Sequence, residues 1–383
     1  MLDLLKGRGH RVYASQDALI YLFNTIRIAG LSPPRQYGLF IVVLAPFIFN
    51  IGWIRYRSIL SVMEILNSVQ AALNIIGMPF KSLTLALSLQ RLHSVKPLLK
   101  ELDACHAESK DVAKIRRCAI TGNRIVFVYI ISYMLYGTLT VVSAVLSGLA
   151  PLTLWIPYVD WHRSTWEYWL QLSFDGLTLY FSLLHQVIND SYPAIYIYII
   201  RTHVQLLARR VSRLGNVLDK SEDANYHELQ ECIIIHQKIL RLLRIVQPVI
   251  SVTMFVQFCI AAAIMSTTMI NISIFGDTNT KITSLIYLFC VLLQIWPTCY
   301  NASYLQADCK KLSMSIFHSN WMTQGKRFNK LLIYFLQRSQ TEMPLWALKM
   351  FPVNLATNVS IAKFSFSLYT FIQQMGLGAH LND

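Results

Sequence analysis

Lysine and arginine are distributed very unevenly around the hydrophobic stretches of this chain. If seven of these stretches cross a bilayer, almost all of the 34 basic residues lie in or beside the segments before the first, third, fifth and seventh crossings, at residues 1–36, 93–123, 202–245 and 306–349. The opposite side carries only Arg55, Arg57, Arg163 and Lys281. Basic loops stay in the cytoplasm during membrane insertion. The pattern therefore predicts a cytoplasmic N-terminus and, after an odd number of crossings, an extracellular C-terminus.

The composition supports a membrane protein with several spans. Of the 383 residues, 54% are hydrophobic and only 14% are charged, which is far more apolar side chain than one soluble core uses. The net charge of +14 is carried by loops between apolar runs, without the interleaved exposed aromatic residues of a nucleic-acid-binding surface. We interpret the positive charge as a topological signal and expect no nucleic-acid partner.

Seven stretches are long and apolar enough to cross a bilayer, which takes about 20 residues of helix. They cover residues 37–53, 62–89, 125–149, 168–200, 246–275, 282–305 and 350–375. Internal prolines, which neighbouring helices of a bundle can accommodate, predict kinks at Pro46, Pro79, Pro193 and Pro297. The predicted fold is all-α with seven transmembrane helices: a cytoplasmic segment 1–36, a six-helix bundle 37–305, a cytoplasmic region 306–349, a final helix 350–375 and an extracellular tail 376–383.

The segments predicted to be cytoplasmic also have helical patterns. Residues 227–245, 326–337 and 96–117 predict amphipathic helices, because apolar residues recur at spacings of three and four while charged residues occupy the other face. The apolar stripe of such a helix has to be buried, either within one subunit or between subunits. The residues expected to form this subunit anchor are Leu229, Ile233, His236, Leu240, Leu331 and Phe335.

Enzyme chemistry finds no support in the sequence. Nucleotide-binding glycine loops, a zinc-protease histidine motif and a serine-hydrolase motif are absent, and no carboxylate pair has catalytic spacing. The seven cysteines fall in predicted spans or cytoplasmic segments and lack zinc spacing, so we expect neither structural disulfides nor a metal site. We therefore predict a protein that is not an enzyme and has no cofactor.

Four charged residues lie within the predicted spans, where burying a charge is costly. Lys363, midway along the last span, fits two interpretations equally: a functional cation, or a lysine that reaches the membrane surface or a water-filled cavity. Lys81 lies nearer a span end, so its side chain is expected to extend to the interface. Asp175 and Asp190 on the fourth span are expected to be solvated or hydrogen-bonded structural residues rather than ligand contacts.

The outer halves of the middle spans combine apolar and aromatic side chains with a few hydroxyl groups. A small volatile organic ligand fits such a lining, because dispersion and desolvation supply affinity while one or two hydroxyls set orientation. Plain helix packing produces the same stripes and is the competing interpretation. The candidate ligand-binding residues are Val69 and Leu73 on the second span, Tyr136, Thr140 and Ser143 on the third, Phe174, Thr178 and Phe181 on the fourth, and Tyr287 on the sixth.

Two parts of the sequence resemble the insect odorant receptor family. A family signature is similar to the run that contains Leu229, Cys232, Ile233, His236, Ile239 and Leu240. The C-terminal third follows the order of residues in that family at Trp321, Lys326, Arg327, Leu331, Leu332, Pro344, 351–355, 363–367, Tyr369 and Thr370. At residues 347–349 the chain departs from the Ala-Gly pair common in the family, which leaves the start of the final span open.

The resemblance implies an odorant-gated, non-selective cation channel in the plasma membrane of a sensory dendrite. In this family four subunits surround one central pore, each contributes its last span, and the cytoplasmic helices form an anchor domain. The shared coreceptor of the family has a long insertion between its fourth and fifth spans, whereas this chain has only residues 202–245 there. The resemblance therefore implies a ligand-specific subunit whose partners are the coreceptor, a volatile ligand and membrane lipid.

The last span also suits a pore on physical grounds. A ring of its apolar side chains in a tetramer would form a constriction that gates by dewetting, with a glutamine amide facing the cation. The predicted pore residues are Leu368, Ile372, Gln373 and Met375, with Gln374 as the alternative glutamine. Lys363 on the axis would repel cations, so we expect its side chain to point away from the permeation path.

Three other functions stay open as alternatives. A gustatory-receptor-type homotetramer would conduct ions without a coreceptor. A solute transporter is less favoured, because the sequence shows no internal repeat. The predicted orientation is the reverse of that of a G-protein-coupled receptor, and this disfavours that class.

Overall fold

The computed structural model describes residues 13–32, 37–41, 43–44, 62–148, 150–152, 154, 156, 158–216, 221–274, 278–340 and 344–374. The helices in this part of the chain are Ser15–Leu19 (η1, a short 3-10 helix), Ile20–Ile28 (α2), Val62–His93 (α4), Val95–Ala104 (α5), Ser109–Ser147 (α6), Thr165–Val211 (α7), Glu222–Ile274 (α8), Thr278–Phe317 (α9), Lys326–Ser339 (α10) and Leu355–Gln374 (α11). An antiparallel hairpin pairs Trp346–Ala347 (β1) with Phe351–Pro352 (β2). The predicted first span, 37–53, lies largely outside the described residues.

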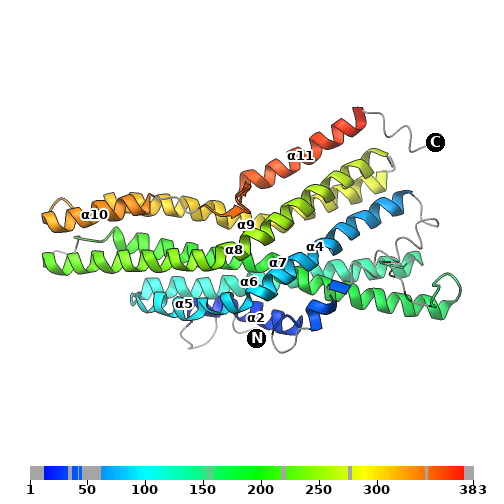
Figure 1. The fold of residues 1–383 in the computed structure, drawn as a ribbon, viewed down its shortest axis with the longest axis horizontal. Coiled ribbons are helices and arrows are strands. Elements are labelled where there is room, and N and C mark those ends of the chain that lie inside the picture. Colours follow the sequence, from blue (N-terminus) through cyan, green and yellow to red (C-terminus); the bar gives the residue numbers. More distant parts are fainter. Residues whose placement is uncertain are drawn as a thin grey trace.

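Long helices run side by side along the long axis of the molecule (Figure 1). The central helix, α7, packs against α6, α8 and α9, while α4 packs against α8. The part of α7 between Val187 and Val211 is buried on nearly every face. A helix that is buried all round belongs in the interior of a bundle. The other helices therefore lie around α7 as a core.

The cytoplasmic segments continue the predicted spans as uninterrupted helices. The predicted amphipathic helix 227–245 and the predicted fifth span 246–275 form one element, α8, which ends at Ile274. In the same way, α7 continues beyond the predicted fourth span to Val211. With 53 residues at about 1.5 Å each, α8 is about 80 Å long, more than twice the thickness of a hydrocarbon core. These helices are long enough to cross a bilayer and to form a domain beside it.

The prediction of one amphipathic helix over residues 96–117 is wrong. The chain instead forms α5, which ends at Ala104, and α6, which begins at Ser109. Between them, the amide of His106 donates to the carbonyl of Asp103 at 3.0 Å and closes a tight turn. Apolar periodicity continues across this turn, since the break depends on contacts with other helices.

The last helix begins later than predicted. The expected final span starts at residue 350, but α11 starts at Leu355. Residues 346–352 form the β1–β2 hairpin, in which Leu348 and Lys349 have positive φ values of 46° and 60°. Asn354 then caps α11, because its Oδ1 accepts a hydrogen bond from the amide of Thr357 at 2.8 Å. The hairpin and the cap determine where the helix starts, and hydropathy reveals neither of them.

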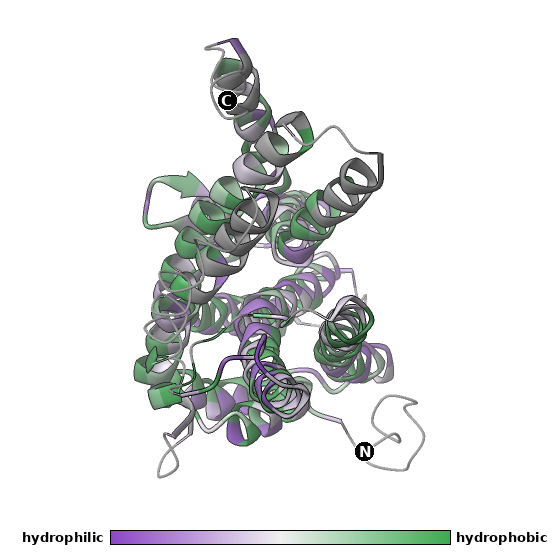
Figure 2. Cartoon of the chain, turned by 90° about the vertical axis from the view of Figure 1, so that its right-hand side faces the viewer, coloured by the Kyte–Doolittle hydropathy of each residue, from purple (hydrophilic) through white to green (hydrophobic). Residues whose placement is uncertain are grey.

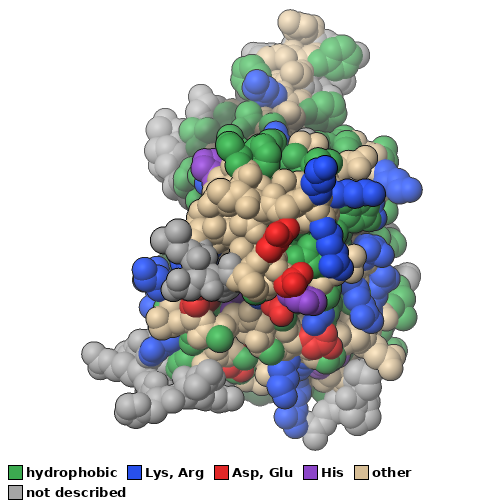
Figure 3. Space-filling model, turned by 90° about the vertical axis from the view of Figure 1, so that its left-hand side faces the viewer, with side chains coloured by type: hydrophobic (Ala, Val, Ile, Leu, Met, Phe, Trp, Pro, Cys, Tyr) green, Lys and Arg blue, Asp and Glu red, His purple; other side chains and the backbone are tan. Residues whose placement is uncertain are grey.

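The two ends of the molecule differ in surface chemistry. The predicted third span exposes large apolar side chains of α6, among them Val128, Leu135, Leu139 and Leu146, and hydrophobic segments are prominent in the view from this end (Figure 2). Lysine and arginine side chains gather at the opposite end (Figure 3). By length and composition alone, two helices in the described part of the chain qualify as membrane spans, Ser109–Ser147 and Glu222–Met269.

Candidate functional site

The predicted ligand-binding residues lie mainly on two helices that pack against each other, α6 and α7. Those on α6 are Tyr136, Thr140 and Ser143, and those on α7 are Phe174, Thr178 and Phe181. Leu73 on α4 is half-buried, whereas the side chains of Val69 and Tyr287 lie outside the described residues. The fold thus brings the two largest groups of candidates onto neighbouring helices.

The aromatic candidates are accessible in the single chain. Tyr136 is 49% exposed and Phe174 is 37% exposed. Phe181 is half-buried, and its ring centroid lies 4.7 Å from that of His185. The hydroxyl of Thr140 donates to the carbonyl of Tyr136 at 2.9 Å, so its proton is already used within the helix. The role of these residues in ligand binding stays a prediction.

A buried polar network lies about one helical turn from Tyr136. Its centre is Asp190 of α7, which is 6% exposed. Asp190 Oδ2 accepts hydrogen bonds from the Tyr133 hydroxyl of α6 at 2.6 Å, from Gln186 Nε2 at 2.9 Å and from Gln294 Nε2 of α9 at 2.5 Å. Asp190 is therefore hydrogen-bonded, as the sequence predicted. One carboxylate joins three helices in the interior of the bundle.

Lys81 of α4 completes this network, and the prediction that it extends to the membrane interface is wrong. The residue is 1% exposed, and its Nζ lies 3.6 Å from Asp190 Oδ1. Nζ also donates to Gln257 Oε1 of α8 at 2.6 Å and to Gln186 Oε1 at 3.3 Å. Because α4 packs against α7 and α8, the side chain at this position faces the bundle instead of lipid. A buried charge is tolerated where it is paired and hydrogen-bonded.

Asp175 has a structural role at the end of α7 that lies nearer its N-terminus. Its Oδ2 accepts from the amide of Leu152 at 3.1 Å, and its Oδ1 accepts from Gln171 Nε2 at 2.8 Å. Gln171 Nε2 also donates to the carbonyl of Leu154 at 2.7 Å. This pair of side chains holds the α6–α7 connection against α7, and the hydrogen-bonded structural role predicted for Asp175 is confirmed.

The apolar stripes predicted to form an anchor face each other within one chain. Three of their residues are buried, namely Leu229, His236 and Phe335, and three are half-buried, namely Ile233, Leu240 and Leu331. The ring centroids of His236 and Phe335 lie 5.5 Å apart in an edge-to-face arrangement. Of the two ways in which the stripes could be buried, the structure shows packing of α8 against α10 within one subunit. A contribution to contacts between subunits stays a prediction.

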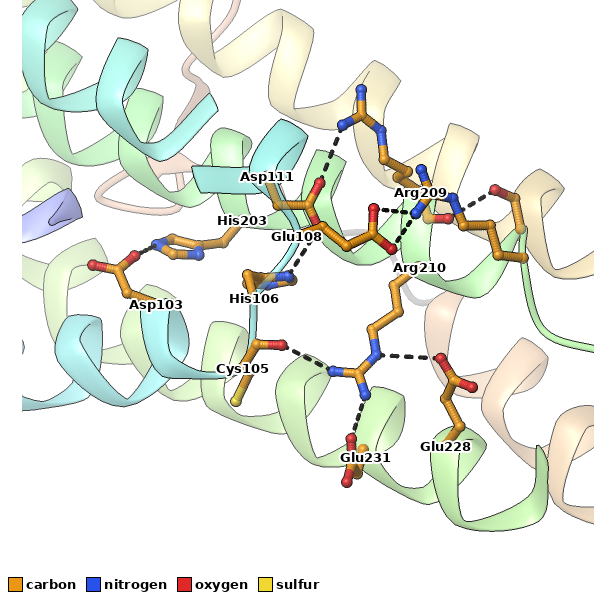
Figure 4. Close-up of polar contacts among 12 residues, drawn as sticks. Asp103, Cys105, His106, Glu108, Asp111, His203, Arg209, Arg210, Glu228 and Glu231 are labelled. Carbon is orange, nitrogen blue, oxygen red and sulfur yellow. Dashed lines mark hydrogen bonds and ion pairs between the residues drawn. The ribbon is translucent and has the colours of Figure 1, made fainter. Parts of the chain in front are cut away.

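Ion pairs hold the turn between α5 and α6 against α7 and α8 (Figure 4). Arg210 of α7 donates to the carbonyl of Cys105 at 3.1 Å and pairs with Glu228 and Glu231 of α8. Nearby, Arg209 pairs with Asp111 at 3.1 Å, and Arg213 pairs with Glu108. These contacts supply the tertiary force that breaks the helix predicted over residues 96–117.

Burial changes the titration of the Asp103–His203 pair beside this turn. Burial lowers the pKa of His203 to about 3 and raises the pKa of Asp103 to about 6. The amide and hydroxyl of Ser15 donate to Asp103 Oδ2 at 2.7 and 2.9 Å, and this partly opposes the rise. His203 Nε2 lies 3.8 Å from Asp103 Oδ1. The pair fastens η1 and α7 to the end of α5 and contributes to structure.

The helix arrangement and these interactions can now be compared with known proteins. A family model described as 7tm Odorant receptor matches residues 61–366. Odorant receptor 42a of Drosophila melanogaster is 33% identical over 379 residues, which cover 96% of this chain and 93% of that protein. The chain belongs to the 7tm odorant receptor family. The resemblance inferred from the sequence is therefore confirmed.

Further comparisons agree on family and fold. Odorant receptor 42b of Drosophila melanogaster is 32% identical over 376 residues, covering 95% of this chain and 94% of that protein. The structure of the insect olfactory receptor OR5 from Machilis hrabei in complex with eugenol matches with a TM-score of 0.78 at 14% identity, over 94% of this chain and 98% of that one. This odorant receptor therefore has the insect olfactory receptor fold. It is a membrane receptor, and the prediction that it is not an enzyme follows from its family.

The predicted pore helix of this odorant receptor, α11, packs against α8 and α9. The Ser365 hydroxyl donates to the carbonyl of Ile361, and Lys363 is exposed in the single chain. The side chains of three predicted pore residues lie outside the described residues, and so does the whole of a fourth: these are Leu368, Ile372, Gln373 and Met375. Their role in a pore stays a prediction.

Sequence reasoning missed the ion pair between Lys81 and Asp190 in this receptor. Each residue was identified as a charge within an apolar span, but the two were assigned separate roles. A lysine and an aspartate in different spans of one bundle are a usable signal, because intramembrane charges usually pair with one another. Hydropathy does not show which spans are neighbours, so the sequence does not select this pair.

Proposed function

We propose that this odorant receptor is the ligand-specific subunit of a ligand-gated, non-selective cation channel and assembles with a coreceptor into a tetramer. It binds small volatile organic molecules in an outer transmembrane pocket, and binding opens a central pore in the plasma membrane of a sensory dendrite. The observation that carries this proposal is the similarity to odorant receptor 42a over almost the whole length of both chains.

The proposed topology has a cytoplasmic N-terminus and an extracellular C-terminus. Figure 3 views the end of the molecule where α10 lies, and basic side chains are concentrated there. The opposite ends of α6 and α7 carry exposed apolar and aromatic residues such as Leu146 and Trp166. A basic end that stays in the cytoplasm follows the positive-inside rule. The distribution supports the proposed orientation.

The short connection between α7 and α8 supports a ligand-specific subunit. Helix α7 ends at Val211 and α8 begins at Glu222. The long insertion that the resemblance assigns to the coreceptor has no counterpart here. We therefore assign odorant recognition to this chain and the shared subunit role to its partner.

The contacts of the bundle suggest how binding reaches the pore. A ligand between α6 and α7 would favour the open state by its difference in affinity for the two states. The network around Asp190 joins α6 and α7 to α9, and α9 packs against α11. A shift of α6 relative to α7 therefore acts on a buried set of hydrogen bonds that also contacts a neighbour of the proposed pore helix.

Co-expression in oocytes with the coreceptor tests this proposal. We expect inward current in response to members of a panel of volatile esters, alcohols and aromatics, with a reversal potential near zero in mixed sodium and potassium. Expression of each subunit alone is the control. Silence across the panel despite surface expression of both subunits would overturn the proposal, and current from this chain alone would indicate a gustatory-type homotetramer.

An epitope at Met1 tests the orientation separately. We expect antibody labelling only after the cells are permeabilised. Labelling of intact cells would reverse the proposed topology, whatever the channel recordings show.

A further inference from the structure

A groove of about 410 Å³ lies between α8 and α10, which run side by side at one end of the molecule (Figure 1). We refer to it as the basic groove. Its polar lining is formed by His236, Arg241 and Arg244 of α8 and by Arg338 of α10. Ile233 and Tyr334 contribute apolar wall. The groove therefore combines three positive charges with a hydrophobic side.

The three arginines of the basic groove have no acidic partner among the residues that the structure describes. The ion pairs in that part of the chain use other basic residues, such as Arg209, Arg210 and Arg213. All three groove arginines are exposed. Guanidinium groups that share one cavity repel one another and attract an anion. The charge of the groove is therefore uncompensated in the single chain.

His236 gives a second, independent indication of a ligand. It lines the groove and is only 2% exposed, yet its Nε2 has no hydrogen-bond partner within the described ranges. Burial, and to a smaller extent Arg338, lowers the pKa of His236 to about 4, so the ring is neutral at physiological pH. A buried nitrogen without a partner is destabilising. A ligand oxygen in the groove would remove that cost.

The position of the groove along α8 suggests where the anion comes from. The predicted span of α8 begins near residue 246, so at about 1.5 Å per residue Arg244 and Arg241 lie about 3 and 8 Å outside it. On the other wall, α10 ends at Ser339, and the hairpin that follows contacts α8 where the amide of Leu348 donates to Ser251 Oγ at 2.9 Å. The arginines thus lie at the level of lipid headgroups, on the side that the proposed topology assigns to the cytoplasm.

We propose that the basic groove binds the phosphorylated headgroup of an anionic lipid from the inner leaflet. Arg241, Arg244 and Arg338 contact the phosphates, since guanidinium groups match phosphate oxygens in charge and geometry. His236 Nε2 donates to or accepts from a hydroxyl of the headgroup, and the Tyr334 side lies against the glycerol region. The site goes beyond odorant recognition and depends only on the proposed orientation.

Binding of dioctanoyl phosphatidylinositol 4,5-bisphosphate to the purified receptor–coreceptor complex tests this site, with lipid-dependent thermal stabilisation as the readout. The groove variant R241Q/R244Q/R338Q is expected to bind the lipid at least about tenfold more weakly, because several charge-assisted hydrogen bonds are lost. The matched control, K310Q/K311Q/K330Q, removes the same charge from exposed positions outside the groove and is expected to bind like the parent. Equal binding by all three proteins, or equal weakening in both variants, would overturn the proposal.

Further arms separate the alternatives. Arg338→Gln alone, which leaves α8 intact, is expected to weaken binding about threefold or more if the triple variant does not fold. Inositol 1,4,5-trisphosphate carries the same phosphates without the lipid tail, and binding as tight as that of the lipid would overturn the membrane source. Loss of co-purification with the coreceptor in the groove variant but not in the control would show that the groove is a subunit interface and would overturn the proposal. None of these readouts requires an odorant response, so they fail independently of the channel proposal.

Discussion

Replacing Lys81 with methionine removes the ammonium group of the buried ion pair and keeps most of the apolar stem. In the parent protein Lys81 Nζ lies 3.6 Å from Asp190 Oδ1 and donates to Gln257 and Gln186. In the variant, Asp190 stays in the interior without its ion-pair partner. The two glutamine oxygens also lose their donor. The substitution therefore leaves polar groups buried and unsatisfied on three helices.

The expected cost follows from the partners that Asp190 keeps. Removal of one partner from a buried ion pair destabilises a protein by about 3–5 kcal/mol, because the other charge is left uncompensated. Asp190 retains hydrogen bonds from Tyr133, Gln186 and Gln294, so we expect the lower end, about 3 kcal/mol. An unfolding entropy of about 2.1 cal/mol/K per residue over 383 residues converts this to a fall of about 4 °C in melting temperature.

The measurement is the melting temperature of the purified receptor–coreceptor complex, followed by size-exclusion chromatography after heating. Lys363→Met is the matched control, since Lys363 is an exposed lysine of α11, and its effect should stay within about 0.5 kcal/mol. The double variant Lys81→Met/Asp190→Leu replaces both charges by apolar groups. Because such replacements are often neutral, the double variant should melt above Lys81→Met alone.

Two results would refute this reasoning. If Lys81→Met melts within about 1 °C of the parent, the lysine is not buried against a charge. If the losses of the two single variants simply add in the double variant, the residues do not interact in the folded receptor, because contacting residues normally show an interaction free energy of about 0.5–3 kcal/mol.

Three further predictions concern the pocket, the pore and the cytoplasmic end. Tyr136→Ala and Phe181→Ala should change the ranking of odorants in dose–response recordings at normal surface expression, because each removes aromatic surface from the proposed pocket. Ile372→Ala should alter basal current or reversal potential with every agonist, since a smaller side chain widens a hydrophobic constriction. Asp103→Asn should raise the melting temperature relative to the parent more at pH 7 than at pH 5. Burial raises the pKa of Asp103 to about 6, so its contribution to stability is present at low pH and is lost as the pH rises through that value.

Controls distinguish these effects from general damage. Phe317→Ala removes an exposed aromatic side chain of α9 outside the proposed pocket and should leave odorant ranking unchanged. Basal current and reversal potential equal to those of the parent would remove Ile372 from the pore. His203→Gln should show the opposite pH trend to Asp103→Asn, because burial lowers the pKa of His203 to about 3 and its protonation in the unfolded state destabilises the fold at low pH. Equal trends in the two variants would exclude burial as the cause.

Helix positions in this receptor follow from the sequence, because they depend on patterns among near neighbours. Apolar runs predicted helices where α4, α6, α7, α8 and α9 lie, and α10 covers the predicted amphipathic helix 326–337. Burial of Phe328, Leu332 and Phe335 on one face of α10 agrees with the same spacing. Length, a period of 3.6 residues and clustered charge are local properties, so a single sequence reveals them.

Helix ends and partners depended on tertiary contacts. The turn at residues 105–108 forms where Arg210 reaches from α7, and α11 starts where a hairpin and the Asn354 cap end. Lys81 donates to Gln186 and Gln257, which lie 105 and 176 residues away in sequence. The sequence by itself determined that a lysine in an apolar helix needs a partner, since an isolated charge is costly to bury. Only the packing of α4 against α7 and α8 decided that this partner is Asp190, because hydropathy carries no information about which helices are neighbours.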